Sequence, residues 1–185
     1  VLYATGRKPN TANIGLENTD ITTNERGAIV VNDTCESSVP GVYAVGDVNG
    51  GPQFTYISLD DFRIVFGALT GNGQYTLKDR KNIPYTTFLT PPLARVGLTE
   101  EDAINKGYTV KTKEMLVATM PRAHVNDYLK GAFKIVVNAD NDLILGATLY
   151  SQGAEELINL IKMAMDNNIP YTYFKNQIFT HPTMA

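Results

Sequence analysis

The stretch TCESSVPGVYAVGD, residues 34–47, decides the fold of this chain. Residues 42–45 form a short run of small and apolar side chains, which predicts a β-strand. The strand runs directly into Gly46 and Asp47. Glycine lets a backbone approach a ligand closely, and ligands bind at the carboxyl ends of strands in open α/β folds. These residues therefore fit two readings equally: a strand end that binds a ligand through Gly46 and Asp47, or a plain strand followed by a turn and a helix.

A helix is expected directly after this turn, at residues 55–69. Thr55 can cap its N-terminus, and Gly71 is well placed to end it. Apolar side chains recur at helical spacing, namely Leu59, Phe62, Val65, Phe66 and Leu69. The free N–H groups and the positive dipole end of such a helix could face an electron-rich ligand atom.

The pattern changes around a polar, glycine-containing stretch at residues 71–82, which predicts a domain boundary between residues 1–75 and 83–185. Upstream, residues 28–31 predict one more strand. Downstream, strands are expected at 85–89, 94–97, 108–119, 132–138 and 143–150, with helices at 100–105 and 154–167. Thr99 and Asp102 are spaced as a capping pair. The second half is therefore predicted to be an α+β domain, an antiparallel sheet with helices.

Four motifs in sequence order resemble one family, the pyridine nucleotide-disulfide oxidoreductases, which includes glutathione reductase, dihydrolipoamide dehydrogenase and mercuric reductase. TCESSVPGVYAVGDV, residues 34–48, resembles the family's second FAD-binding motif. ATGRKPN at 4–10 is similar to the segment that returns from the NAD(P)H domain. TPPLARVGLTE at 90–100 resembles the start of the dimerisation domain, and HPT at 181–183 resembles the family's ending. The resemblance covers the whole chain.

The resemblance implies a fold and a set of binding residues. Residues 1–75 would be the C-terminal part of an incomplete FAD-binding domain, and residues 83–185 the dimerisation domain of a homodimer. Asp47, next to Gly46, would bind the ribityl or pyrophosphate part of FAD. Phe54 and Thr55 would offer backbone N–H groups to the carbonyl edge of the flavin, where the helix dipole favours negative charge. NAD(P)H would be the electron donor.

Departures from the usual family pattern resemble one branch. GDVNGGPQFTYISLDDFRIV, residues 46–65, replaces a run that has a Thr-Pro pair and small residues. Tyr56, Asp60 and Asp61 are bulkier and more acidic, and Pro92 stands where glutamate is common. These features are similar to the bacterial reactive-chlorine-resistance flavoenzymes, which are described as copper(II) reductases.

The two histidines and the single cysteine are the remaining candidates for chemistry. The resemblance implies that His181 reaches the partner subunit's active site as an acid–base group, oriented by a following glutamate; the sequence stops at Ala185, before it. A lone histidine is otherwise a surface or capping residue, which is the interpretation for His124. Cys35 lacks a second cysteine at the family's spacing and is interpreted as structural.

Composition excludes several other classes. A net charge of -3 without a clustered basic face argues against a nucleic-acid partner. No apolar run approaches the length of a membrane span, and no signal peptide is visible. One cysteine permits no internal disulfide and suits the reducing cytoplasm. No cluster of residues suggests a metal site.

Two functions from different classes follow. In one, the chain is the C-terminal fragment of an enzyme that passes electrons from NAD(P)H through FAD to a dithiol, small-molecule, disulfide or metal-ion acceptor. In the other, the chain by itself is a non-catalytic dimerisation module. Within the enzyme class, a mercuric-reductase or dihydrolipoamide-dehydrogenase type is the alternative. Both ends of the sequence look cut, so a fragment is expected, and the half-site it carries is not expected to retain FAD.

Overall fold

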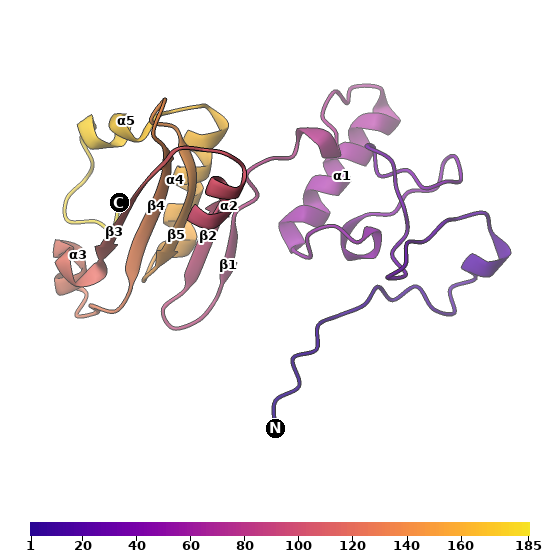
Figure 1. Ribbon diagram of the computed structural model, residues 1–185. Coiled ribbons are helices and arrows are strands. Elements are labelled where there is room, and N and C mark those ends of the chain that lie inside the picture. The colour runs from indigo at the N-terminus through magenta and orange to yellow at the C-terminus, as the bar shows by residue number, and fades with distance from the viewer. The chain divides into compact units, whose positions relative to one another are not determined.

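The computed structural model describes residues 1–185, which divide into two compact units, Val1–Arg80 and Lys81–Ala185 (Figure 1). Each unit has its own pattern of secondary structure and is described by itself. None of the helices combines the length and the apolar character that crossing a membrane requires.

The first unit contains one long helix, α1 (Thr55–Thr70), and three short 3-10 helices, η1 (Leu16–Asn18), η2 (Gly46–Asn49) and η3 (Leu77–Asp79). Helix α1 ends where the sequence predicts, with Gly71 as a left-handed C-cap at φ 71°. Its N-cap is Phe54, with no side-chain hydrogen bond, so the prediction that Thr55 caps the helix is wrong. Thr55 is instead the first helical residue.

The strands expected at 28–31 and 42–45 are absent as extended strands. Each region makes a single antiparallel bridge, Thr23 to Ile29 and Glu36 to Tyr43. A strand needs a neighbour along its length to pair its backbone N–H and C=O groups. Here neither region has one partner along its length: the Ile29 N–H, for example, donates to the Val48 carbonyl in η2 at 3.0 Å, whereas the Val30 N–H donates to Thr22. The strands predicted in this unit are therefore wrong.

The apolar residues that the sequence singled out in α1 do not form its buried face. The buried residues of this helix are Ile57, Asp61 and Ile64, at spacings of four and three. Four of the five apolar positions that the sequence singled out are instead exposed, namely Leu59, Phe62, Phe66 and Leu69. Helical periodicity located the helix but not the side on which it packs.

The second unit is built on a five-stranded, wholly antiparallel sheet in the order β1-β2-β5-β4-β3. Its strands are β1 (Tyr85–Thr87), β2 (Leu93–Gly97), β3 (Val110–Leu116), β4 (Ala132–Asn138) and β5 (Ile144–Tyr150). Its helices are α2 (Glu100–Asn105), α3 (Pro121–Val125), α4 (Ala154–Asp166) and α5 (Tyr171–Asn176), with η4 (Val117–Thr119) after β3. The expected α+β class is confirmed. The predicted strand at 108–119 is shorter, since its end turns into η4, and α3 and α5 were not predicted.

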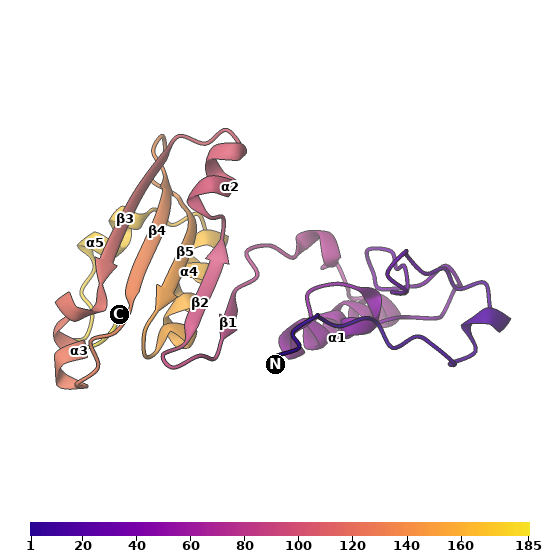
Figure 2. The same cartoon turned by 60° about the horizontal axis from the view of Figure 1, so that its bottom comes forward.

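Helix α4 lies across one face of this sheet and closes the main core (Figures 1 and 2). The core contains Ala94 and Val96 from β2, Ala147 and Leu149 from β5, and Ala154 and Ile158 from α4. Leu157, Ile161 and Met165 pack against it. The apolar face of α4 is thus used inside the domain. The capping pair at α2 is confirmed, with Thr99 Oγ1 accepting the Asp102 N–H at 3.0 Å.

Candidate functional site

The turn at Gly46 is held tightly against the first turn of α1. Gly46 is buried and has a φ of +71°, a left-handed conformation that glycine adopts without steric cost. A Cβ at this position would lie 2.6 Å from Ser58 Oγ and 3.3 Å from Ser58 Cβ. Gly46 therefore allows an approach of η2 to α1 that a larger residue would prevent.

Asp47 follows Gly46 and points its carboxylate outward. Its side chain is 51% exposed, and Oδ2 lies 3.8 Å from Nη1 of Arg7, whose side chain is 66% exposed. An ion pair this open to solvent contributes little free energy. The carboxylate of Asp47 is thus available to accept hydrogen bonds from a ligand.

The N-terminus of α1 lies beside this turn and carries no side-chain cap. The first intrahelical bonds run from the N–H groups of Ile57 and Ser58 to the carbonyl of Phe54. The N–H of Phe54 donates to the carbonyl of Pro52 at 3.1 Å, so the N–H of Thr55 is the better placed of the two expected donors. Thr55 is exposed, and its backbone N–H sits at the positive end of a 16-residue helix.

A buried carboxylate whose role the sequence analysis missed binds the turn through hydrogen bonds. Asp61 is 0% exposed. Its Oδ2 accepts the backbone N–H of Gly46 at 2.7 Å and the side-chain amide of Asn49 at 2.9 Å. Its Oδ1 accepts Nη2 of Arg80 at 2.5 Å. The signal was present in the sequence, because Asp61 lies four residues after Ile57 and three before Ile64 on one helical stripe.

Arg80 completes this cluster by joining two neighbouring carboxylates. Its Nε donates to Oδ2 of Asp60 at 2.8 Å, and the hydroxyl of Tyr75 donates to the same oxygen at 3.3 Å. The guanidinium side chain is only 10% exposed. Burial disfavours its charge, but the bonds to Asp61 and Asp60 outweigh this and raise the pKa of Arg80. The cluster therefore holds a permanent positive charge against two carboxylates.

His181 lies in the exposed C-terminal segment of the second unit, apart from any element of secondary structure. Met184 packs against a small cluster of Val117, Met120 and Ala123, which ties this segment to η4 and α3. His124, the other histidine, is exposed on α3 and has Nε2 2.8 Å from the carbonyl of Ala118. That contact fits the surface role expected for His124.

Comparison with known protein families places both units. The family model for the pyridine nucleotide-disulphide oxidoreductases matches residues 1–61, and the model for the dimerisation domain of the same enzymes matches residues 83–185. The chain belongs to this oxidoreductase family. The resemblance that the four motifs suggested is confirmed, as is the fold of the dimerisation domain.

Relatives within the oxidoreductase family include the branch expected from the sequence. RclA of Escherichia coli strain K12 is 47% identical over 185 residues, and mercuric reductase of Staphylococcus aureus is 36% identical over 185 residues. The structure titled HOCl-induced flavoprotein disulfide reductase RclA from Escherichia coli matches 98% of this chain with a TM-score of 0.94. All of this chain aligns, but it spans only 42% of RclA and 34% of the mercuric reductase.

Cys35 of this oxidoreductase chain is buried beside the Asp61 cluster. Burial, and next the negative charge of Asp61, raise the pKa of the Cys35 thiol to about 11. A thiol that stays protonated at neutral pH is a poor nucleophile, because the thiolate is the reactive form. The geometry supports the structural role expected for Cys35.

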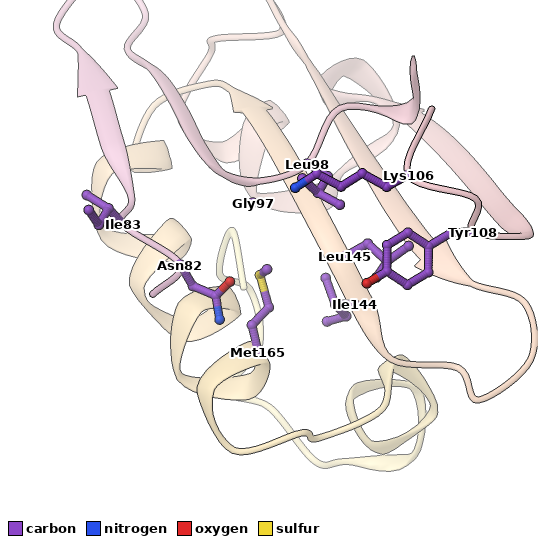
Figure 3. Close-up of a pocket in the computed structure, with 9 residues that line it drawn as sticks. All are labelled: Asn82, Ile83, Gly97, Leu98, Lys106, Tyr108, Ile144, Leu145 and Met165. Carbon is purple, nitrogen blue, oxygen red and sulfur yellow. The ribbon is translucent and has the colours of Figure 1, made fainter. Parts of the chain in front are cut away.

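A cavity of about 450 Å³ lies beside β2 and β5 in the dimerisation domain of the family (Figure 3). Lys106 and Tyr108 lie on one side of it, and Asn82 and Met165 on the other. Neither a thiol nor an imidazole lines it. Across the chain, no group of three or more His, Cys, Asp or Glu side chains is arranged to hold a metal ion.

Proposed function

We propose that this chain is the C-terminal part of a flavin-dependent oxidoreductase that moves electrons from NAD(P)H through FAD to a dithiol or metal acceptor. The observation that carries the proposal is the pairing of the Gly46–Asn49 turn with the uncapped N-terminus of α1. The two elements place an exposed carboxylate next to backbone N–H donors. Acceptor and donor groups of this kind suit a ligand with both hydroxyl groups and carbonyl oxygens.

The residues present fit FAD at this position. The carboxylate of Asp47 would accept a hydrogen bond from the ribityl or pyrophosphate-linked part of the cofactor. The N–H of Thr55, with Phe54, would bind the carbonyl edge of the ring, where the positive end of α1 favours negative charge. Gly46 allows the turn to lie close to α1, which would let both residues hold the same cofactor. When bound, FAD supplies the transfer of two electrons between a nicotinamide and an acceptor.

His181 is proposed as the acid–base group for that acceptor, acting in the partner subunit of a homodimer. An imidazole titrates near neutral pH and suits proton exchange with a thiol. The exposed position of His181 leaves its ring accessible. One buried cysteine and no internal disulfide fit a cytoplasmic protein. The similarity to RclA and to mercuric reductase supports a disulfide or metal-ion acceptor.

The cofactor role is tested in the full-length protein by Asp47→Ala. Loss of a hydrogen bond to a charged group costs about 1.5–3 kcal/mol, so FAD affinity should fall roughly ten- to a hundredfold. Affinity is measured by titrating the apoprotein with FAD and following the quenching of flavin fluorescence. Glu17→Ala is the matched control, because it removes one exposed carboxylate from the same unit. Unchanged affinity in the Asp47 variant would refute the role of Asp47.

The isolated chain is proposed to act as a non-catalytic module that dimerises through residues 83–185. The apolar face of α4 packs on β2 and β5 within the domain, whereas Leu160 and Met163 of α4 remain exposed. Sedimentation equilibrium at micromolar concentration should show a dimer, and its absorption spectrum should lack a flavin band. Limited proteolysis within residues 71–82 should release a stable C-terminal piece. A strictly monomeric chain would contradict the assembly.

A further inference from the structure

Asp61 divides its two carboxylate oxygens between two different tasks. Oδ2 binds the turn, through the N–H of Gly46 at 2.7 Å and the amide of Asn49 at 2.9 Å. Oδ1 binds the guanidinium of Arg80 at 2.5 Å. The carboxylate is wholly buried, so neither oxygen has solvent to replace a lost partner. Each bond on Asp61 therefore constrains the position of the group at its other end.

A stability role alone does not account for this arrangement. A buried ion pair seldom stabilises a fold more than apolar side chains of the same volume would. What such a pair can do is fix one geometry, since hydrogen bonds are directional and apolar contacts are not. The geometry fixed here is that of η2, because the Gly46 N–H is bound at the residue just before Asp47. Rotation of that peptide would turn the Asp47 carboxylate away from its present direction.

We infer that Asp61 is a positioning residue for the cofactor site: it holds the Gly46–Asn49 turn so that Asp47 faces the ligand. This inference rests on the proposed cofactor role of Asp47. Arg80 supports Asp61 because its positive charge balances the buried negative charge of the carboxylate. Asn49 supports it from the turn, where its Nδ2 also lies 3.3 Å from the Ala44 carbonyl and its Oδ1 accepts the Gly51 N–H at 3.0 Å. Asp61 itself touches no ligand.

The first test compares Asp61→Asn with Asp60→Asn in the full-length protein. Both variants remove one negative charge from adjacent residues of α1, and both residues bind Arg80, but only Asp61 binds the turn. The dissociation constant for FAD, from fluorescence titration of the apoprotein, should rise roughly tenfold or more for Asp61→Asn and stay within about twofold for Asp60→Asn. Equal effects of the two variants would overturn the inference.

A spectroscopic readout follows the turn without any cofactor. The amide proton of Gly46 donates to a carboxylate, so its NMR resonance in the 185-residue chain should lie downfield and move upfield in Asp61→Asn. It should stay in place in Asp60→Asn and in Asp47→Ala. An unmoved Gly46 resonance in Asp61→Asn would overturn the inference.

The variant Asn49→Ala removes another hydrogen bond to Asp61 and leaves the buried charge intact. It therefore tests the inference even if Asp61→Asn does not fold. It should raise the FAD dissociation constant roughly threefold, and no change in that constant would count against the inference.

A double variant separates the inference from the function on which it rests. If Asp61 acts through Asp47, then Asp61→Asn should weaken FAD binding by less than about twofold in an Asp47→Ala background. Full multiplication of the two effects would overturn the positioning role. If Asp47→Ala alone leaves FAD affinity unchanged, the proposed function fails instead. If Asp47→Ala weakens binding and Asp61→Asn does not, the function stands and the inference fails.

Discussion

The two units of this chain are ordered by different interactions. In Lys81–Ala185, a continuous antiparallel sheet and α4 enclose an apolar core that includes Val96, Leu149 and Ile158. In Val1–Arg80, the single long helix buries two isoleucines and a carboxylate, and two isolated bridges replace a sheet. The core of the second unit is apolar, whereas the first unit buries the Asp61–Arg80 ion pair together with a few apolar side chains.

This difference matters for function because an apolar core and a buried ion pair respond differently to amino-acid substitution. Apolar burial is non-directional and is spread over many residues, so it tolerates small shifts. A buried ion pair depends on a few bonds with defined geometry. The candidate cofactor residues lie in the unit with the less regular structure, where a scaffold of side-chain bonds positions a turn. We therefore expect single substitutions to lower the free energy of unfolding through different interactions in the two units: polar bonds in the first and apolar packing in the second.

The largest effect is expected from Arg80→Met in the first unit. This change leaves the buried carboxylate of Asp61 without its guanidinium, which typically costs about 3–5 kcal/mol of folding free energy. Urea unfolding, with hydrogen exchange of the Ile57 and Ile64 amides as the local probe, measures the loss. Arg63→Met is the control, because Arg63 is 66% exposed and lies 4.0 Å from Asp60. A surface pair of that kind contributes at most about 1 kcal/mol. Similar losses in both variants would show that Asp61 does not depend on Arg80.

The next effect is expected from Ile158→Ala in the core of the second unit. Ile158 is 2% exposed and packs between α4 and the sheet, so the cavity should cost about 2–5 kcal/mol. Leu160→Ala, on the same helix but at a side chain 41% exposed, should cost less than about 1 kcal/mol. Hydrogen exchange of β5 amides reports the difference. The loss for Ile158 should not depend on salt concentration, and a strong salt dependence would contradict an apolar core.

The same contrast explains which parts of the structure the sequence could predict. In the second unit, the strand and helix periods match the packing. The predicted bounds of β4 (132–138) and α2 (100–105) are correct, and those of α4 differ from the structure by one residue at the C-terminal end. Sheet pairing then fixes the register. Helices α3 and α5 were missed because five or six residues are too few to show a helical period, and neither helix has a side-chain cap like the Thr99–Asp102 pair that marks the equally short α2. The turn into η4 shortened a predicted strand for a similar reason.

In the first unit, local patterns were a poorer guide because long-range bonds decide the structure. Residues 42–45 have strand composition but make one bridge. Gly46 and Asp47 were picked out by their motif, and the structure brings them beside α1. The role of Asp61 depends on Arg80, nineteen residues away, and on Gly46, fifteen residues away. No short-range pattern records such partners, although the spacing of Asp61 with Ile57 and Ile64 marks it as buried.

A smaller effect is expected from raising the pH around Cys35. Burial raises the pKa of this thiol to about 11, with Asp61 as the next cause. An unfolded cysteine has a pKa of about 8.5, so the folded state binds the proton more tightly. The stabilisation is complete below the unfolded pKa and is lost as pH rises through about 11, on the order of 3 kcal/mol in all.

The variant Cys35→Ala isolates this thiol from the other groups that titrate at high pH. The free energy of unfolding is measured from pH 8 to about pH 11 for both proteins, by urea denaturation. The wild-type curve should fall more steeply than that of the variant. Two parallel curves would mean that the thiol is not desolvated in the folded state and that its burial beside Asp61 is wrong.

The smallest effect is expected from Thr99→Ala at the start of α2. Thr99 Oγ1 accepts the Asp102 N–H at 3.0 Å, and the loss of such a cap costs about 1 kcal/mol. Thr99→Ser keeps the hydroxyl and should cost almost nothing. The hydrogen bonds from Thr99 lower the pKa of Asp102, so their contribution is present above the unfolded pKa of about 4 and is lost as pH falls through the folded value. The difference between the alanine and serine variants should therefore narrow below about pH 4. A loss as large as that of Ile158→Ala would show that the second unit, like the first, depends on single polar contacts.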